Sequence, residues 1–201
     1  MDIYSLIQEG EHQQQDFKYK ITNINKIARS LSAFANTDGG RLLVGVRDNG
    51  GIAGVDSDEE IYMIEAAANL CCKPSLNCSM RVEVVEGHRV LVAEVPPSQV
   101  LPVFAIEEDG RKRAYVRVDD ENIVASPVHL SIWRTSDRGC TLGEEEFRCL
   151  NLIPQEGVTL NRFTRSSRLP RRVAVNLLAD FVRLGLVRQT LVGQKWLYSC
   201  L

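Results

Sequence analysis

The sequence has no run of about 20 apolar residues, the length that a helix needs to cross a membrane. Its first residues, Met1 to Ser5, also lack the basic and then apolar pattern of a signal peptide. These absences lead us to expect a cytoplasmic protein with no membrane partner. Aromatic residues are scarce, at 6%, but 44% of residues are hydrophobic and 25% are charged, as in ordinary globular proteins.

Several catalytic and metal-binding motifs are missing too. The six cysteines include no Cys-x-x-Cys pair with an accompanying set of histidines, the spacing typical of a zinc site, and we expect them to be reduced. The chain has no Gly-x4-Gly-Lys-Ser/Thr loop for a nucleotide triphosphate. Its three histidines indicate no Ser-His-Asp or Cys-His arrangement. The sequence therefore favours a protein that is not an enzyme and needs no cofactor.

The net charge is only −2, but the charges are distributed unevenly along the chain. Residues 1–143 carry 15 Lys and Arg against 21 Asp and Glu, whereas residues 144–201 carry 9 against 5. From Gly157 onward, 8 basic residues accompany a single acid, Asp180. Such an asymmetry is typical of a nucleic-acid-binding region. We expect a nucleic-acid partner, with DNA favoured over RNA.

One stretch, residues 32–48, organises the N-terminal half. Apolar residues recur at helical spacing from Ile24 to Ala35 and predict an amphipathic helix. The segment 36–40, Asn-Thr-Asp-Gly-Gly, ends this helix, because asparagine and glycine reach positive φ at low cost. The short apolar run 42–46, with Val44 and Val46, predicts a buried strand, and the segment 48–51, Asp-Asn-Gly-Gly, predicts a hairpin turn to a strand at 52–55.

The rest of this half alternates between helices and hairpins. A short helix at 3–9 and an edge strand at 13–20 precede the central stretch, and a helix follows it at 57–70. Two β-hairpins are predicted at 80–95 and 103–118. A last helix begins at Ser126-Pro127, because proline is favoured at the first helical position. Together these elements predict an α+β domain over residues 1–136, with helices packed on a mixed, mostly antiparallel sheet.

The pattern changes beyond a predicted linker at residues 137–143. Helices are expected at 144–152, from Thr159 and over 171–184, with Leu169-Pro170 as the turn between the last two. Two strands follow, around 186–189 and 195–198. This order resembles the winged helix-turn-helix plan, which implies a small DNA-binding domain over residues 144–201. In that plan the helix after the turn enters the major groove and the wing touches the backbone.

The N-terminal motifs carry a second resemblance. Asp16-Phe17-Lys18, the segment Ser-Ala-Phe-Ala-Asn-Thr-Asp-Gly-Gly at 32–40, the strand Gly45-Val46-Arg47-Asp48 and the later Ile52-Ala53-Gly54 stand in the order of the Schlafen AlbA-type nucleic-acid-binding domain. The match covers roughly residues 9 to 126 and resembles bacterial regulators that carry this domain. It implies the α+β fold predicted above, without the ATPase-like module of larger members.

The resemblance also raises an enzymatic alternative. In the ribonuclease branch of the family, three carboxylates form the catalytic site, and the matching positions here are Glu11, Asp16 and Asp48. Clustered carboxylates suit Mg²⁺ or Mn²⁺, which would be the cofactor under this alternative alone. The chain departs from that branch by having Asp16 in place of a glutamate, and by having one lobe instead of two. Solvated surface acids are the competing interpretation.

Candidate nucleic-acid-binding residues form two sets. The N-terminal set lies on the predicted edge strand and on the second hairpin, where basic residues would either contact phosphates or keep an edge soluble. The C-terminal set surrounds the predicted turn, and no acid interrupts its arginines. The two sets are Lys18, Lys20, Arg111, Lys112, Arg113 and Arg117, and Arg162, Arg165, Ser166, Arg168, Arg171 and Arg172.

These observations predict a DNA-binding protein, and more narrowly a transcriptional regulator. A homodimer is expected, because helix-turn-helix readers usually match a two-fold operator. A metal-dependent endoribonuclease acting on structured RNA is the first alternative. The second is a ligand-sensing or dimerisation module without enzymatic activity.

Overall fold

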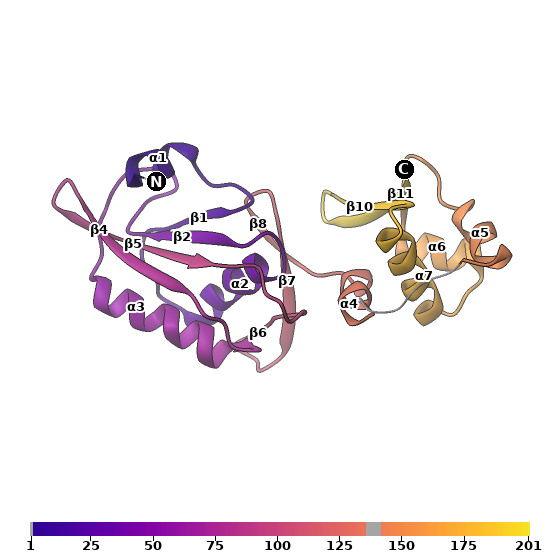
Figure 1. Ribbon diagram of the computed structural model, residues 1–201, viewed down its shortest axis with the longest axis horizontal. Helices are drawn as coiled ribbons and strands as arrows, with labels where there is room; N and C mark the ends of the chain where they lie inside the picture. Colours follow the sequence, from indigo (N-terminus) through magenta and orange to yellow (C-terminus); the bar gives the residue numbers. More distant parts are fainter. Residues whose placement is uncertain (1, 136–141) are drawn as a thin grey trace. The chain divides into compact units, whose positions relative to one another are not determined.

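The computed structural model describes residues 2–135 and 142–201, and the chain divides into two compact units, Met1–Val124 and Ala125–Leu201 (Figure 1). The division falls earlier than the domain boundary at residue 136 that the sequence suggests. Most of the predicted linker 137–143 lies outside the described residues. Among the described residues, no helix is long and apolar enough to cross a membrane.

The N-terminal unit combines helices with two sheets, as the α+β prediction states. Its helices are α1 (Ile3–Glu9), α2 (Ile24–Ala35) and α3 (Ser57–Ala66), the last continued by the π-helical turn η1 (Ala67–Cys71). One sheet has the order β1-β2-β5-β4 and the other β3-β6-β7-β8. Among the strands that the structure describes in this unit, only the pair β1 and β2 is parallel, which confirms the mostly antiparallel arrangement. The strands are β1 (Gln15–Lys18), β2 (Gly40–Val44), β3 (Cys72–Lys73), β4 (Ser79–Val85), β5 (His88–Val95), β6 (Phe104–Ile106), β7 (Lys112–Val118) and β8 (Glu121–Val124).

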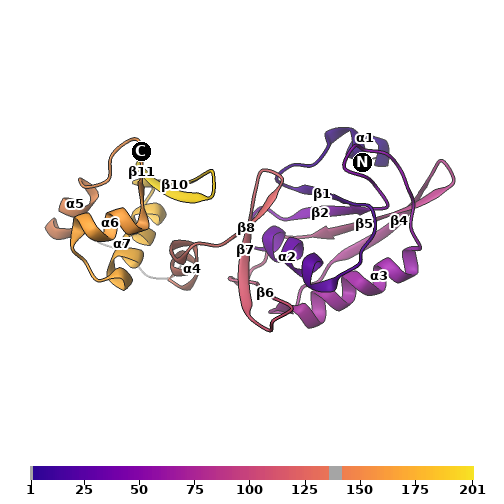
Figure 2. The ribbon, with the colours of Figure 1, turned by 180° about the vertical axis from the view of Figure 1, so that it is seen from behind.

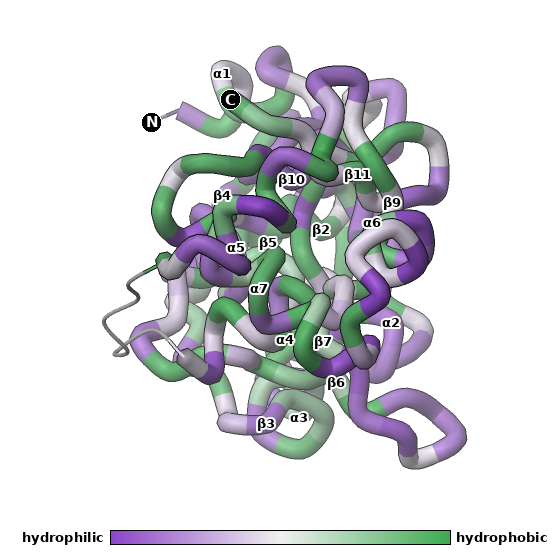
Figure 3. Tube along the Cα trace, turned by 90° about the vertical axis from the view of Figure 1, so that its right-hand side faces the viewer, coloured by the Kyte–Doolittle hydropathy of each residue, from purple (hydrophilic) through white to green (hydrophobic). Residues whose placement is uncertain are grey.

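Helix α2 lies at the centre of this unit, between the two sheets (Figures 1 and 2). Its apolar face is fully buried at Leu31 and Phe34, where it meets the central strands β2 and β5. The apolar run of β5 is coloured green in Figure 3 and is buried from Val90 to Ala93. Helix α1 covers the opposite face of the first sheet, where Ile3 and Leu6 join a second apolar cluster. Burial of both faces explains why β5 is almost continuously apolar.

The polar residues of α2 fasten the second sheet. The Asn36 side chain donates to the carbonyl oxygens of Val103 and Tyr115, at 2.8 and 2.9 Å, and accepts from the Val103 amide at 2.8 Å. The Ser32 hydroxyl donates to the same Val103 oxygen at 2.9 Å. Because buried backbone groups need partners, these side chains satisfy Val103 and Tyr115 just beyond Phe104–Ala114, the last backbone pair of β6 and β7. The asparagine therefore does more than end the helix.

The two glycines after the helix are required by close packing. A Cβ atom on Gly40 would lie 2.3 Å from the Phe34 ring, and one on Gly39 would lie 2.8 Å from Pro97 Cδ. Gly39 also has a φ of 72°, which favours glycine. The strand β2 can thus start directly against the helix that precedes it.

The hairpin predicted at 48–51 forms, but its second strand is much shorter than the sequence suggests. Val46 and Ile52 make one isolated bridge. The amides of Ala53 and Gly54 both donate to the Gly45 carbonyl, at 2.8 and 3.0 Å, so the chain curls back instead of running on as a strand.

The described residues of the C-terminal unit form four helices and one three-stranded sheet. The sheet order is β10-β11-β9, with both pairs antiparallel. Buried residues from α6 and α7, with Phe163, Leu178 and Phe181 fully enclosed, form its core. The elements are α4 (Pro127–Arg134), α5 (Glu144–Leu150), β9 (Val158–Thr159), α6 (Leu160–Ser167), α7 (Arg171–Arg183), β10 (Val187–Val192) and β11 (Lys195–Cys200).

Helix α4 belongs to this unit, although the sequence suggests the N-terminal domain. Ser126 caps it, with its hydroxyl accepting from the His129 amide while the Ser126 amide donates to His129 Nδ1. The Gln189 side chain of β10 donates to the Ser126 hydroxyl at 3.0 Å, and the His129 ring packs edge-on against Trp196 of β11 at 4.6 Å. The partners of α4 are thus some 60 residues away along the chain. A local sequence pattern could therefore not predict which unit contains this helix.

Candidate nucleic-acid interface

The structure gathers the C-terminal arginines around the turn between α6 and α7. Helix α6 turns Leu160 and Phe163 into the core, and α7 does the same with Ala174 and Leu177. Because those faces are apolar, the polar positions must point outward. All members of the predicted C-terminal set are exposed, namely Arg162, Arg165, Ser166, Arg168, Arg171 and Arg172.

The charges of these arginines are not neutralised within the described residues. Arg171 Nη1 donates to Asn161 Oδ1 at 2.7 Å, a neutral partner. None of the five arginines forms an ion pair in the part of the chain that the structure describes. Elsewhere in this unit Arg148 pairs with Glu145 at 3.6 Å. The surface around the turn therefore carries a concentrated positive charge.

Two backbone features of this turn show what its arginines cost in stability. Helix α7 begins with Arg171 and Arg172 and has no acid in its first turn, although the helix dipole favours acids there. Arg168 ends α6 in the left-handed region, with φ 56° and ψ 17°, which costs about 1–2 kcal/mol for a residue with a side chain. These arginines are therefore kept at some cost to helix stability. A bound anion at the start of α7 would offset it.

Neighbouring elements limit which part of α7 is free. Helix α4 runs along one side, where the Ser131 hydroxyl donates to Asn176 Oδ1 at 2.9 Å and Arg183 Nη1 donates to the Thr135 hydroxyl at 3.2 Å. On the other side, a groove of about 310 Å³ between α5 and α7 has Glu145, Glu146 and Asp180 in its lining. The accessible positive surface is consequently the α6–α7 turn and the first turn of α7.

The N-terminal set is more dispersed. Lys18 Nζ pairs with Asp16 at 2.8 Å, and Lys20 Nζ lies 3.6 Å from Glu59. At the tip of the β6–β7 hairpin, Arg111 Nε donates to Asp109 Oδ2 at 2.7 Å. Lys112 and Arg113 are exposed and form no ion pair among the described residues. The hairpin tip keeps a smaller positive charge than the sequence suggests, because its own aspartate neutralises Arg111.

Arg117 needs a correction, because the structure buries it. The residue is 2% exposed, and its guanidinium lies 5.1 Å above the Phe34 ring. Its Nη1 donates to Asn122 Oδ1 at 3.0 Å, and its Nη2 donates to the Gln15 carbonyl at 3.0 Å and lies 3.5 Å from Asp16 Oδ1. A side chain held in this way ties β7 to β1 and does not reach a phosphate.

The three acids of the ribonuclease branch are only partly brought together. Glu11 and Asp16 are neighbours. The pKa of Glu11 is raised, mainly by burial and secondly by the hydrogen bond to Asp16. Asp16 is 4% exposed and its two oxygens face Lys18 and Arg117. Asp48 is exposed on the hairpin turn. Within residues 2–135 and 142–201, no three acids, histidines or cysteines are placed to hold a metal ion. Because both oxygens of Asp16 already face cations, the three acids do not fit Mg²⁺ or Mn²⁺.

One surface feature has no counterpart in the sequence motifs. The guanidinium of Arg47, on the hairpin after β2, lies 5.4 Å above the ring of Tyr19, which is 57% exposed. A lone tyrosine 28 positions away from an arginine gives no signal of this contact. Exposed cations stacked on aromatic rings do occur on nucleic-acid-binding surfaces.

Comparison with known proteins gives one family. The family model described as Schlafen, AlbA_2 matches residues 11–126. No match is found among curated proteins. Solved structures with similarity include the DIP2311 protein from Corynebacterium diphtheriae, with 22% identity, a TM-score of 0.45 and coverage of 70% of this chain and 33% of that chain. Another is the N-terminal domain of a RecG-related protein from Nitrosomonas europaea, with 23% identity, a TM-score of 0.43 and coverage of 72% and 96%.

Proposed function

The chain belongs to the Schlafen, AlbA_2 family, and from that premise we propose that it is a DNA-binding protein, in its simplest form a transcriptional regulator. The C-terminal unit is the DNA reader, and the family domain is the platform that carries it. The observation that supports this assignment best is the cluster of exposed, unpaired arginines at the α6–α7 turn. Phosphate contacts of this kind supply most of the affinity of DNA-binding proteins.

The element order of the C-terminal unit supports a winged helix-turn-helix. Helix α5, strand β9, helices α6 and α7 and the hairpin of β10 and β11 follow one another in the order of that fold. In this arrangement α7 enters the major groove by its first turn, led by Arg171 and Arg172. The hairpin carries Arg188 and Lys195 as exposed cations that reach the flanking backbone.

The N-terminal unit adds a weaker, general attraction to nucleic acid. Lys18, Lys20 and Arg111 have acidic neighbours, and so Lys112 and Arg113 are its strongest phosphate ligands. A dimer matches the two-fold symmetry that helix-turn-helix operators usually have. The family domain is thus assigned to assembly and general affinity, and the C-terminal unit to sequence reading.

A comparison of two triple variants tests which surface binds DNA. Arg165→Ala, Arg171→Ala and Arg172→Ala remove three charges from the α6–α7 turn, while Arg111→Ala, Lys112→Ala and Arg113→Ala remove three from the β6–β7 hairpin. Binding to a fluorescent duplex of mixed sequence is measured by anisotropy at one salt concentration. We expect the C-terminal variant to lose at least a hundredfold in affinity and the hairpin variant to lose less than tenfold.

The two variants are matched, because each loses three exposed cations and neither changes the core. Arg148→Ala, on the exposed side of α5, controls for the loss of any arginine from the C-terminal unit. Equal losses in the two triple variants would mean that the binding is only general electrostatics. A larger loss in the hairpin variant would transfer the reader to the N-terminal unit.

A further inference from the structure

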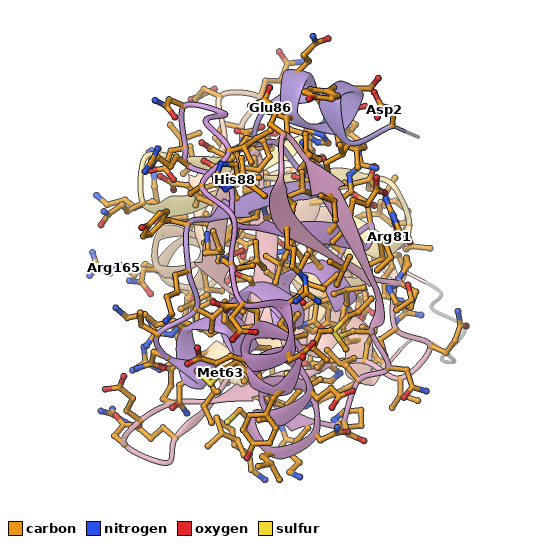
Figure 4. All side chains as sticks on the ribbon, turned by 90° about the vertical axis from the view of Figure 1, so that its left-hand side faces the viewer. Asp2, Met63, Arg81, Glu86, His88 and Arg165 are labelled. Atoms are coloured by element: carbon orange, nitrogen blue, oxygen red, sulfur yellow. The ribbon has the colours of Figure 1, made fainter. Side chains whose placement is uncertain are left out.

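Strand β4 is an open edge of the first sheet. It has seven residues, Ser79–Val85, and in the described part of the chain it pairs only with β5, on its inner side. Figure 4 shows Arg81 on this outer strand, with Glu86 and His88 at its hairpin end. Edge strands of this length present a row of backbone donors and acceptors to any other strand, and proteins usually blunt or cover them.

The hairpin that joins β4 to β5 fixes which backbone groups point outward. Its loop is Glu86-Gly87, with φ values of 53° and 78°, and Val85 pairs with His88. In a two-residue hairpin the closing pair is hydrogen-bonded, and hydrogen-bonded and non-bonded pairs then alternate. Met80, Val82 and Val84 therefore direct their amides and carbonyls away from β5. None of these groups has a hydrogen bond among the described residues.

The opposite edge of the same sheet, β1, is closed by its own surroundings. The Phe17 amide donates to Glu11 Oε1 at 2.8 Å, and the Phe17 carbonyl accepts from Lys18 Nζ at 2.8 Å. The Gln15 carbonyl accepts from the His12 amide and from Arg117, both at 3.0 Å. The outward backbone groups of β1 are thus bonded by neighbouring groups, while those of β4 are free among the residues that the structure describes. Strand β4 is therefore the edge of this sheet that can pair with another strand.

The side chains of β4 are complementary to themselves in an antiparallel pair. Arg81 and Glu83 flank Val82 on one face, with exposed fractions of 39% and 32%, and their charges are opposite. On the other face Met80 and Val84 flank the same residue, and Val84 is 71% exposed. A two-fold axis through Val82 brings Arg81 opposite Glu83 of the partner subunit, and Met80 opposite Val84 of the partner subunit.

We propose that β4 pairs with β4 of a second copy of this chain, antiparallel and centred on Val82, so that the two first sheets join into one. Every outward amide and carbonyl of Met80, Val82 and Val84 then has a partner. Opposite charges and apolar residues face one another across the pair, which is the arrangement that stabilises neighbouring strands. The pairing locates the dimer proposed above and rests on the geometry of β4, independently of DNA binding.

The mass of the full chain in solution tests the proposal. Light scattering after size-exclusion chromatography, from 1 to 100 µM, is expected to give twice the 22.5 kDa of one chain. Val82→Pro removes an outward amide, and Val84→Lys places a charge in the apolar pair. Each is expected to raise the dissociation midpoint at least tenfold. Val100→Lys is the matched control, because Val100 is 63% exposed outside the strands of the unit.

A cross-link tests the register without depending on affinity. Residues on the two-fold axis of an antiparallel pair lie about 5.5 Å apart, within the range of a disulfide. Val82→Cys should form a cross-linked dimer under mild oxidation, well above the wild type with its native cysteines, and Val100→Cys should not. Far-UV circular dichroism checks that every variant is folded. A wild type that stays at 22.5 kDa at 100 µM, or a dimer that Val82→Pro and Val84→Lys leave unchanged, would overturn the proposal.

Discussion

Two arginines of this chain lie in opposite environments, and the contrast explains why their roles differ. Arg117 is 2% exposed and binds Asn122, the Gln15 carbonyl and Asp16, whereas Arg168 is exposed at the end of α6. Removal of one member of a buried ion pair leaves an uncompensated charge, which typically costs 3–5 kcal/mol or so. An exposed arginine carries no such penalty.

Arg117→Met should therefore lower the free energy of unfolding of the N-terminal unit by about 3 kcal/mol, toward the low end because Lys18 still neutralises Asp16. Urea unfolding followed by far-UV circular dichroism measures it. Arg113→Met, four positions earlier on the same strand and exposed, is the control and should change stability by less than about 0.5 kcal/mol. Equal effects of both substitutions would refute a structural role for Arg117.

Replacement of Arg168 should change stability and DNA affinity in opposite directions. Glycine relieves a left-handed strain of about 1–2 kcal/mol and adds roughly 0.5–1 kcal/mol of unfolded-state entropy, so Arg168→Gly should stabilise the C-terminal unit by about 0.5 kcal/mol. The same change removes a proposed phosphate contact and should weaken DNA binding. Arg168→Ala loses the same charge and keeps the strain, so it should weaken binding without stabilisation. A glycine variant less stable than the alanine variant would contradict this account.

At the scale of the elements, α4 depends on a buried histidine. Burial lowers the pKa of His129 to about 4, and its Nδ1 accepts the Ser126 amide, so the folded state holds a neutral ring. The unfolded state binds a proton below its ordinary pKa near 6.5, while the folded state does not. The stability due to the neutral ring is therefore complete above pH 6.5 and is lost as the pH falls toward 4.

Between pH 7 and pH 5 this linkage should destabilise the C-terminal unit by about 2 kcal/mol. Both tryptophans of the chain, Trp133 and Trp196, lie in this unit, so tryptophan fluorescence in urea reports its unfolding alone. His129→Asn cannot take up a proton and should lose most of the pH dependence. An equal pH dependence in wild type and variant would assign the effect to other groups.

Sequence patterns predict elements well where the determinants are local. Asn23 caps α2 and Thr159 caps α6, and both helices form close to their predicted bounds. The mixed, mostly antiparallel fold follows from the same kind of signal. The pairing of β1 with β2 and the burial of Asn36 do not, because their partners lie on strands that come later in the chain.

The candidate sites show the same division. Five arginines without an intervening acid are visible in the sequence, and all are exposed. The burial of Arg117 was not predictable, because alternation on β7 says which residues share a face and not which face a helix covers. Likewise, the spacing of Glu11, Asp16 and Asp48 does not reveal that Lys18 and Arg117 occupy the oxygens of Asp16.

At the scale of the whole molecule, the cations at both oxygens of Asp16 argue against a nuclease. A metal would have to compete with two cations for a carboxylate that is 4% exposed. We expect no cleavage of transfer RNA above the level of Asp48→Ala, in Mg²⁺ or Mn²⁺, in a time course of labelled RNA. Metal-dependent cleavage by the wild type that Asp48→Ala abolishes would establish the ribonuclease alternative.

The charge layout of the whole chain is the basis for expecting DNA binding at the C-terminal end. The N-terminal part is acidic overall, and several of its candidate cations, Lys18, Lys20 and Arg111, have carboxylate neighbours. The positive charge from Gly157 onward is concentrated and largely unpaired among the described residues. Each phosphate contact releases counterions, so the salt dependence of binding measures how many contacts a surface makes.

The salt dependence of DNA binding by the full chain is therefore the most direct test. On B-DNA the slope of log affinity against log salt is about −0.9 for each phosphate contact. Loss of the three contacts of Arg165, Arg171 and Arg172 should flatten the slope by about 2.7 per bound chain. The matched variant of Arg111, Lys112 and Arg113 should change it by less than one contact. A slope that the C-terminal variant leaves unchanged, or that only the hairpin variant flattens, would contradict the account.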